Sequence, residues 1–312
     1  MSEVKKIATR ESYGKALVEL GREHEDIVVM DADLAGSTKS GMFQKEFPDR
    51  FFDIGIAEAN MAGIAAGMAA CGKTPFISSF AMFATGRAYE QIRNSIAYPK
   101  LNVKICASHA GISVGEDGAT HQCIEDLSLM RSIPGMVVIS PADDVEARAA
   151  VKAIYDYHGP AYLRFGRLAV PCFNDEETYK FELGKGIRIR EGKDVTLVAT
   201  GLCVDATIKA AEKLAADGID AEVINIHTIK PIDKDLLAES AKKTGKVFTI
   251  EEHSVIGGLG SAVCEALSEV APTPVCRLGI QDVFGESGPA AELLKKYRLD
   301  ADGIYEQVKE AL

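Results

Sequence analysis

Residue types that could do chemistry gather between positions 108 and 122. This stretch reads Ser-His-Ala-Gly-Ile-Ser-Val-Gly-Glu-Asp-Gly-Ala-Thr-His-Gln and follows a short apolar run. Histidines and carboxylates can exchange protons or hydrogen-bond a polar ligand near neutral pH, and glycines let the backbone approach that ligand. The stretch predicts a polar site around His109, Asp117 and His121. A solvated loop with incidental histidines is the alternative, while His-x-x-x-Asp…His is no standard metal-ligand spacing.

Glu58 is a second candidate, because it lies where a predicted strand turns into a predicted helix. Parallel α/β sheets carry their sites at the carboxyl ends of strands, and a carboxylate in the first helical turn meets the positive end of the helix dipole. The plainer interpretation is a glutamate that caps this turn. Ala59, Gly63 and Gly67 follow at four-residue intervals, a pattern that fits either a tight subunit contact or dense packing within the chain.

Further residues could bind an anion or a planar ring. Arginine suits bidentate phosphate recognition, although a single arginine is more often a surface or salt-bridging residue. Aromatic residues on an apolar segment usually belong to the core, but they can also stack on a heterocycle. The residues concerned are Arg10, Ser37, Arg164 and Arg167 for the anion, and Phe80 and Phe83 for the ring.

A glycine turn at 257–260 also precedes a predicted helix, which is an arrangement that can bind phosphate. The acidic residues Glu251 and Glu252 lie just before it and would repel a pyrophosphate. The chain has no G-x-G-x-x-G at a first strand–helix turn, which argues against a dinucleotide-dependent dehydrogenase.

The elements that must position these residues alternate between strand-like and helix-like segments. In the first half we predict strands near 27–30, 51–55, 74–78, 103–107, 137–140 and 161–165, and helices at 9–23, 58–71 and 86–97. After a polar stretch the second half resumes with strands at 194–199, 221–226, 247–251 and 275–278, and helices at 204–216, 234–244, 260–270, 290–296 and 302–311. This alternation predicts an α/β fold of two domains, each a mainly parallel sheet flanked by helices. We expect a first domain at 1–172, a linker at 173–192 and a second domain at 193–312.

Composition narrows the class of protein. The 35 Lys and Arg against 46 Asp and Glu give a net charge of −11, which argues weakly against nucleic-acid binding because phosphates require basic clusters. No apolar run approaches the roughly 18 residues of a membrane helix, and the first residues lack a signal-peptide pattern. The seven cysteines are scattered without a C-x-x-C pair, which favours free thiols in the cytoplasm over disulfides or zinc.

Together these motifs resemble the C-terminal half of transketolase, a thiamine-diphosphate enzyme family, over essentially the whole chain. Residues 53–58 match the family element D-x-G-I-x-E, residues 115–122 match G-E-D-G-P-T-H-Q, and residues 140–143 match x-P-A-D. The resemblance implies a pyrimidine-binding domain followed by a transketolase C-terminal domain.

The resemblance also implies roles for the cofactor-facing residues. Glu58 would hydrogen-bond the aminopyrimidine ring of thiamine diphosphate and so promote its activation. Phe80 and Phe83 would pack on that ring, and Asp33 would belong to the same cofactor site. The family usually has a further aromatic residue where this chain has Gly86, so Tyr89 or a partner would have to complete the pocket.

The same resemblance assigns substrate contacts. His121 would assist proton transfer at the reacting carbonyl, and Asp117 would bind a substrate hydroxyl. The residues that would hold the sugar phosphate are Arg10, Ser37, His109 and Arg167. Transketolases usually read G-I-R-E-H where this chain has Ala57 and Ala59 around Glu58.

The sequence contains no Gly-Asp-Gly, the motif with which the family's N-terminal domain binds Mg²⁺ and diphosphate. We therefore expect one subunit of a split transketolase, active only with a partner that carries that domain and binds most of the Mg²⁺. We expect no metal ligands in this chain and an α2β2 assembly. The enzyme would transfer a two-carbon ketol unit from a ketose phosphate to an aldose phosphate.

Three alternatives stay open. One is a protein like 1-deoxyxylulose-5-phosphate synthase, although such synthases typically lack a histidine at position 109. Another is the β subunit of a 2-oxoacid dehydrogenase, which would lack the 115–122 motif. The third is a non-catalytic homologue that only binds a partner, but Glu58, Asp117 and His121 are all present.

Overall fold

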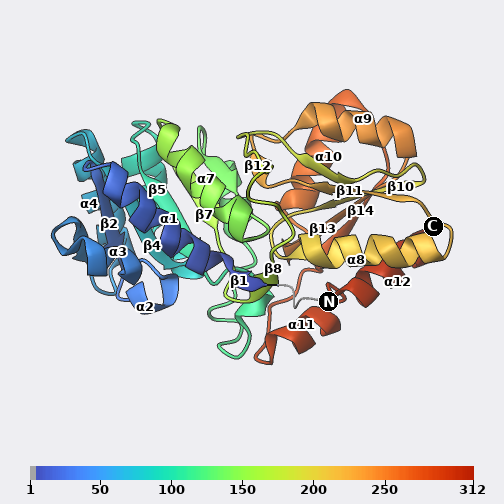
Figure 1. Ribbon diagram of the computed structural model, residues 1–312, viewed down its shortest axis with the longest axis horizontal. Coiled ribbons are helices and arrows are strands. Elements are labelled where there is room, and N and C mark those ends of the chain that lie inside the picture. Colours follow the sequence, from blue (N-terminus) through green and yellow to red (C-terminus); the bar gives the residue numbers. More distant parts are fainter. Residues whose placement is uncertain (1–4) are drawn as a thin grey trace.

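The computed structural model describes residues 5–312, which form two packed lobes (Figure 1). The first lobe is built on a seven-stranded sheet in the order β12-β6-β7-β5-β4-β2-β3. Its strands are β2 (Ile27–Asp31), β3 (Phe51–Asp53), β4 (Thr74–Phe80), β5 (Lys104–Ser108), β6 (Val137–Ile139), β7 (Ala161–Arg164) and β12 (Thr228–Lys230). All neighbours pair in parallel except β12, which is antiparallel to β6.

Helices cover both faces of this first sheet. Figure 1 shows α1 (Thr9–Glu23) and α7 (Asp144–Asp156) on the face toward the viewer. The other face carries α4 (Glu58–Ala70), α6 (Asp126–Ser132) and the helical segments Phe83–Arg87, α5 (Tyr89–Gln91) and Ile92–Ala97. Alternate residues of β2 belong to the two cores: Ile27 and Val29 pack with α1 and α7, whereas Val28 and Met30 pack with α4.

Short elements complete the first lobe. They are β1 (Lys6–Ala8), β8 (Ala169–Pro171), α2 (Ala35–Thr38), α3 (Gly41–Glu46) and the 3₁₀ turns Pro48–Arg50 and Ile112–Val114. β1 pairs antiparallel with β8, so the two ends of this part of the sequence lie side by side.

The second lobe contains a five-stranded sheet in the order β14-β13-β10-β11-β9. Its strands are β9 (Ile187–Arg190), β10 (Val195–Ala199), β11 (Ala221–Asn225), β13 (Val247–Ser254) and β14 (Val275–Ile280). One face is covered by α8 (Cys203–Ala216), α11 (Ala290–Lys296) and α12 (Ala301–Ala311), and the other by α9 (Lys234–Thr244) and α10 (Leu259–Val270). Only β9 runs antiparallel to its neighbour. The predicted class, two mainly parallel sheets flanked by helices, is confirmed.

Several segments differ from the sequence prediction, including α6 and β12, which it lacked. Residues 173–192 contain β9, which pairs with β11 although charged residues interrupt its apolar pattern. Helix α7 was absent from the predicted elements; it begins after Asp143, whose carboxylate accepts the Glu146 N–H at 3.0 Å. Such a cap is a helix-start signal.

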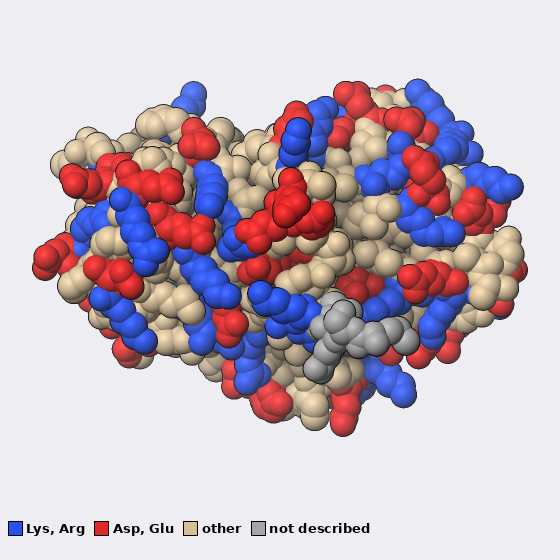
Figure 2. Space-filling view, viewed as in Figure 1, with Lys and Arg blue, Asp and Glu red and all other residues tan. Residues whose placement is uncertain are grey.

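Side-chain charges are mixed on the surface. On the face shown in Figure 2, Lys and Arg alternate with Asp and Glu over both lobes. Within residues 5–312, no helix is both long and apolar enough to cross a membrane.

Candidate functional site

The predicted site residues follow strands that end at one edge of the first sheet. Because β2, β3, β4, β5 and β7 are parallel, their carboxyl ends meet there. Asp33 follows β2, Glu58 follows β3, Phe80 ends β4, His109 follows β5 and Arg167 follows β7. The fold therefore brings to one edge residues that are widely separated in the sequence.

Glu58 is the first residue of α4 and is only 1% exposed. Its Oε2 accepts a hydrogen bond from Nη1 of Arg87 at 2.8 Å, and Oε1 accepts a weaker one from Ser79 Oγ at 3.4 Å. The carboxylate is thus directed toward side chains of the sheet edge, and the capping role considered from the sequence does not describe these hydrogen bonds.

Aromatic rings line the space beside Glu58. The ring centroids of Phe80 and Phe83 are 6.0 Å apart at an interplanar angle of 19°. The His109 ring stacks on Phe80 at 3.8 Å, and the edge of His121 meets Phe83 at 5.3 Å. Phe80 is buried while Phe83 is half-buried, so the second ring is partly open to solvent.

Arg87 is a residue that sequence reasoning missed. Besides binding Glu58, its guanidinium lies 4.8 Å from the centroid of Phe83. A flat donor group therefore already contacts both the buried carboxylate and an aromatic face. Its signal in the sequence was its place directly after Gly86 and four residues after Phe83. Tyr89, considered as the missing aromatic of the pocket, instead shares a 2.9 Å hydrogen bond with Ser132 of α6.

His109 opens the loop of residues 109–122. Its backbone has a φ of 57°, its Nδ1 lies 2.8 Å from Ser108 Oγ, and its Nε2 lies 3.4 Å from Arg10 Nη1. Burial, reinforced by the charges of Arg10 and Arg167, lowers the pKa of His109 to about 3. The imidazole is therefore neutral at pH 7, with one ring nitrogen able to accept a hydrogen bond.

The other predicted residues of this loop are more exposed. His121 is half-buried, with Nδ1 3.0 Å from Thr120 Oγ1. Asp117 is exposed on the same loop. The loop thus offers a neutral histidine inside and a carboxylate outside.

Positive charge gathers around His109. Arg10 donates from Nη1 to the Ser37 carbonyl at 2.8 Å, and its buried Nε has no hydrogen-bond partner within residues 5–312. Arg167 donates to the Val114 carbonyl and, at 2.9 Å, to Glu116 Oε2. Both arginines and Lys39 contribute to the lowered pKa of His109.

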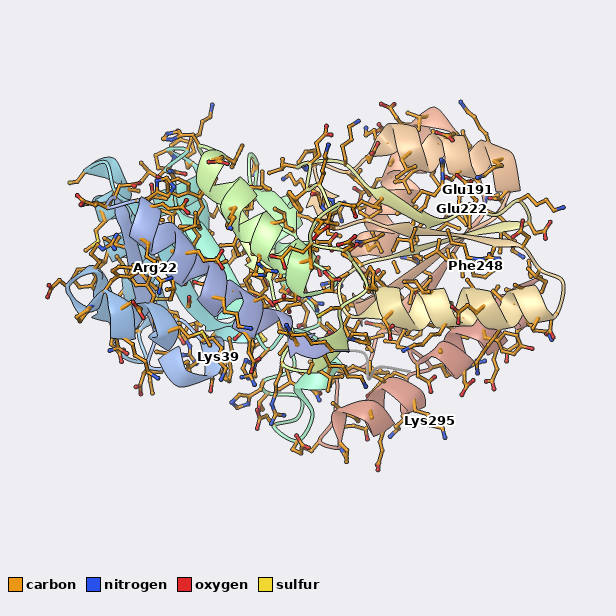
Figure 3. All side chains as sticks on the ribbon, in the orientation of Figure 1. Arg22, Lys39, Glu191, Glu222, Phe248 and Lys295 are labelled. Atoms are coloured by element: carbon orange, nitrogen blue, oxygen red, sulfur yellow. The ribbon has the colours of Figure 1, made fainter. Side chains whose placement is uncertain are left out.

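Lys39 is the third cation. It directly follows α2 and has a φ of 72°. Figure 3 shows it beside α2, low on the first lobe. Together with the two arginines it makes an environment suited to an anion.

Two predicted residues lie outside this contact network. Asp33 is exposed at a φ of 62°, and its N–H donates to Asp53 Oδ1 at 3.2 Å. Arg164, considered from the sequence as an anion ligand, is instead buried and donates to Asp126 Oδ2 at 2.8 Å. Arg164 is therefore a structural residue at the contact between the lobes.

The glycine turn of the second lobe has its helix N-terminus filled. Oε2 and Oε1 of Glu251 accept the N–H groups of Leu259 at 2.6 Å and Gly260 at 2.8 Å. A Cβ at Gly258 would lie 2.1 Å from Glu251 Oε2. The sequence predicted that acidic neighbours disfavour a phosphate here. The geometry gives the reason, since the Glu251 carboxylate already binds the N–H groups that a phosphate would need.

The first site combines a buried carboxylate, parallel aromatic faces, a neutral histidine and a group of cations. The carboxylate and rings suit a flat heterocycle with a hydrogen-bonding nitrogen, and the cations suit a phosphate-sized anion. Within residues 5–312 no three His, Cys, Asp or Glu side chains are grouped so that they could hold a metal ion.

Comparisons with known proteins match both lobes. The family model "Transketolase, pyrimidine binding domain" matches residues 5–171, and "Transketolase, C-terminal domain" matches residues 184–304. A Methanocaldococcus jannaschii protein, provisionally named a transketolase C-terminal section, is 50% identical over 305 residues, covering 97% of this chain and 96% of its own length. A 6-deoxy-6-sulfo-D-fructose transketolase subunit of a Clostridium species is 46% identical over 301 residues, covering 96% and 93%.

A solved structure resembles the whole fold. The structure described as "Split gene transketolase, inactive beta4 tetramer" superposes with a TM-score of 0.91 at 56% identity and covers 98% of both chains. The likeness extends over both lobes and therefore includes the edge of the first sheet where the candidate site lies.

Proposed function

Because this chain belongs to the transketolase family, as the C-terminal, split-gene type of subunit, we propose that it forms half of an active site for two-carbon ketol transfer. The donor would be a ketose phosphate and the acceptor an aldose phosphate. A separate N-terminal subunit would supply the other half. The observation that carries this proposal is the buried Glu58 carboxylate beside two parallel phenylalanine rings.

Thiamine diphosphate would supply the carbon nucleophile and the electron sink of the reaction. The chain's residues fit its aminopyrimidine end. Glu58 would hydrogen-bond the ring nitrogen, at the carboxylate oxygen that now accepts from Arg87. Phe80 and Phe83 would pack on the ring. Asp33, at the exposed turn after β2, is proposed to belong to this cofactor site. Burial of Glu58 makes its hydrogen bond strong, because little water competes for it.

Two histidines would serve the reacting carbons. His121 meets the edge of Phe83, so it is proposed to hold and return a proton beside the cofactor ring. His109 is neutral at pH 7 and would hydrogen-bond the substrate through its ring. Asp117 is exposed on the same loop, within reach of a flexible polyol, and is proposed to bind a substrate hydroxyl.

The cations would bind the phosphate end of the sugar. Arg10, Arg167 and Lys39 all act electrostatically on His109, so a phosphate bound among them would lie near His109. Ser37 is anchored to Arg10 through its carbonyl, which leaves its hydroxyl for the ligand. Arginine pairs readily with either a phosphate or a sulfonate, and the Clostridium relative is named for a sulfonated ketose.

Helix α4 carries the face proposed to meet other subunits. An ideal Cβ on Gly63 or Gly67 would have no atom within 4 Å, and Ile56, two residues before Glu58, is 75% exposed. A neighbouring backbone could therefore approach closely beside the cofactor site. The proposed partner would bind the diphosphate and most of the Mg²⁺, and two copies of each subunit would assemble as α2β2. The solved split-gene relative, described as an inactive tetramer of one subunit type, supports the need for a second subunit.

The test is ketol transfer from xylulose 5-phosphate to ribose 5-phosphate with thiamine diphosphate and Mg²⁺. The chain is assayed alone and after mixing with an N-terminal transketolase subunit from the same genome. We expect activity only in the mixture, with the Glu58→Gln mixture as the inactive control.

Two further donors separate the alternatives. Turnover of pyruvate instead of xylulose 5-phosphate would replace the proposal with a synthase or oxoacid reaction. Preference for a sulfonated ketose would keep ketol transfer but change the donor. Full activity of the chain alone would overturn the split-enzyme proposal.

A further inference from the structure

The loop of residues 109–122 cannot hold its shape through secondary structure alone. It has positive φ angles at His109, Gly111, Gly115 and Gly118, of 57°, 78°, 85° and 73°, and only one 3₁₀ turn, Ile112–Val114. Such a backbone keeps one conformation only when its surroundings fix it. Several of the contacts that fix it come from the second lobe.

Glu252, near the end of β13, makes the first of these contacts. Its Oε2 accepts the Ser113 N–H at 3.1 Å and its Oε1 accepts the Ser113 hydroxyl at 3.2 Å. The approach is close, since a Cβ at Gly111 would lie 2.3 Å from the Glu252 carboxyl carbon. The Arg164 guanidinium lies 4.0 Å from Glu252 Oε1 and donates to the Glu252 carbonyl at 2.9 Å.

The segment of residues 285–288 makes the second contact. Gln122, at the end of the loop, donates from Nε2 to the Glu286 carbonyl at 2.9 Å. A Cβ at Gly115 would lie 3.3 Å from the Gly288 carbonyl, and one at Gly118 would lie 2.4 Å from Ser287 Oγ. Elements that follow β12 in the sequence therefore hold the loop at Ser113 and at its end, while Arg10 and Arg167 contact it from the first lobe.

We propose that the second lobe acts in catalysis as a clamp, with Glu252 as a positioning residue that holds the 109–122 loop in its substrate-binding conformation. Glu252 touches neither the cofactor-facing rings nor Glu58, so it acts through Ser113. This inference rests on the proposed function only for the substrate role of the loop; the clamp itself is a property of the chain.

The residues proposed for the cofactor lie on elements outside the clamp. Glu58 begins α4, Phe80 ends β4 and Phe83 begins the helical segment after it. His109 and His121 of the loop contact Phe80 and Phe83, but Glu252 holds the loop at Ser113. Loosening the loop there should therefore weaken substrate binding and turnover much more than cofactor affinity. A general loss of stability would instead affect both together.

The first measurement is hydrogen exchange on the chain itself. Glu252→Ala removes both acceptors, and we expect amide exchange in residues 111–116 to become about tenfold faster. Glu252→Gln should restore most of the protection, because its amide oxygen can accept the Ser113 N–H while its NH₂ group donates to the Ser113 hydroxyl. Ser113→Ala, a smaller change, should give an intermediate increase and serves if Glu252→Ala does not fold.

Glu251→Gln is the matched control. Glu251 is an equally buried carboxylate on the same strand, but it holds the N-terminus of α10 and not the loop. Exchange in residues 111–116 should be the same in this variant as in the parent. The clamp would be overturned if exchange in these residues became faster in Glu251→Gln. It would also be overturned if exchange did not become faster in Glu252→Ala and Ser113→Ala.

The second measurement uses the assembled enzyme. For Glu252→Ala we expect the KM of the ketose phosphate to rise about tenfold and the Kd of thiamine diphosphate to stay within about twofold. An equal rise in the KM of the ketose phosphate and the Kd of thiamine diphosphate would overturn the positioning role. If the parent complex has no ketol-transfer activity but the exchange data are as expected, the proposed function fails and the clamp stands.

Discussion

The carboxyl edges of the two sheets contain similar parts, yet their glutamates bind different partners. Each has a buried glutamate next to a helix start, Glu58 at α4 and Glu251 at α10. Both oxygens of Glu251 accept hydrogen bonds from backbone N–H groups at the start of α10. Glu58 instead pairs with Arg87, whose side chain is 49% exposed. A carboxylate at a helix start is therefore a candidate ligand-binding group when its partners are side chains and not the N–H groups of its own helix.

Replacing these two glutamates by glutamine should have the largest and most opposite effects. Glu58→Gln should lower kcat by at least about 100-fold with little change in stability, because one hydrogen bond to the cofactor ring is lost. Glu251→Gln should leave kcat unchanged but lower the unfolding free energy by about 2 kcal/mol, because one buried N–H loses its acceptor. Assays of the assembled enzyme and denaturant unfolding of the chain measure the two quantities. The comparison breaks if both variants lose activity equally.

Asp31 sharpens the comparison, because the first edge also contains a carboxylate used for structure. It accepts hydrogen bonds from the Leu34 N–H at 2.5 Å, Thr38 Oγ1 at 2.7 Å and Ser40 Oγ at 2.8 Å. Burial outweighs these bonds and raises the pKa of Asp31 from 3.8 to about 6. The folded chain therefore binds a proton that the unfolded chain releases between these pH values, and this contribution to stability falls as pH rises through that window.

Asp31→Asn should remove that dependence. As pH rises from 4 to 6.5, the unfolding free energy of the variant should increase relative to that of the parent by up to about 3 kcal/mol. The two hydroxyls can accept from the asparagine NH₂ group, so the turn keeps its bonds. Urea unfolding at a series of pH values gives the difference. A difference that stays constant with pH would remove Asp31 from this role.

Arg167 gives the smallest effect and has a close counterpart in the second lobe. Arg167→Ala should raise the KM of phosphorylated sugars about tenfold, since one charged hydrogen-bonding partner is lost. The KM of unphosphorylated ketoses should change little. Arg190 likewise donates to a carbonyl, that of Ala221, and pairs with a neighbouring carboxylate, Asp220, so Arg190→Ala is the control. An equal effect of Arg167→Ala on both kinds of sugar would contradict a phosphate role.

The sequence predicted the regular elements well where the apolar pattern is local. The buried run at 27–30 became β2, and the helix predicted at 9–23 matches α1. It did not predict β12, whose three residues are defined by pairing with a strand about ninety positions earlier. It also missed α7, although Asp143 supplies a cap and Ala147, Ala150, Val151 and Ile154 form a buried apolar face.

The site was predictable in its residue types but not in its contacts. His109 and Arg10 are 99 positions apart, and only the fold places them 3.4 Å from each other. Arg87 and Glu252 were missed as partners, since each acts on a residue far away in the sequence. Arg164 and Arg167 differ by three positions, yet one is buried against Asp126 and the other is 39% exposed. The sequence pattern alone did not distinguish the buried arginine from the exposed one.

β12 has a consequence for how the chain is made. Domains generally fold as they leave the ribosome, amino-terminal part first. The first sheet, however, remains open along β6 until Thr228–Lys230 has been synthesised and can pair with it. By then β9, β10 and β11 have already emerged. The first sheet can therefore be completed only after part of the second lobe has been synthesised, and a chimera that exchanges the second lobe must bring a β12 that fits the recipient's β6.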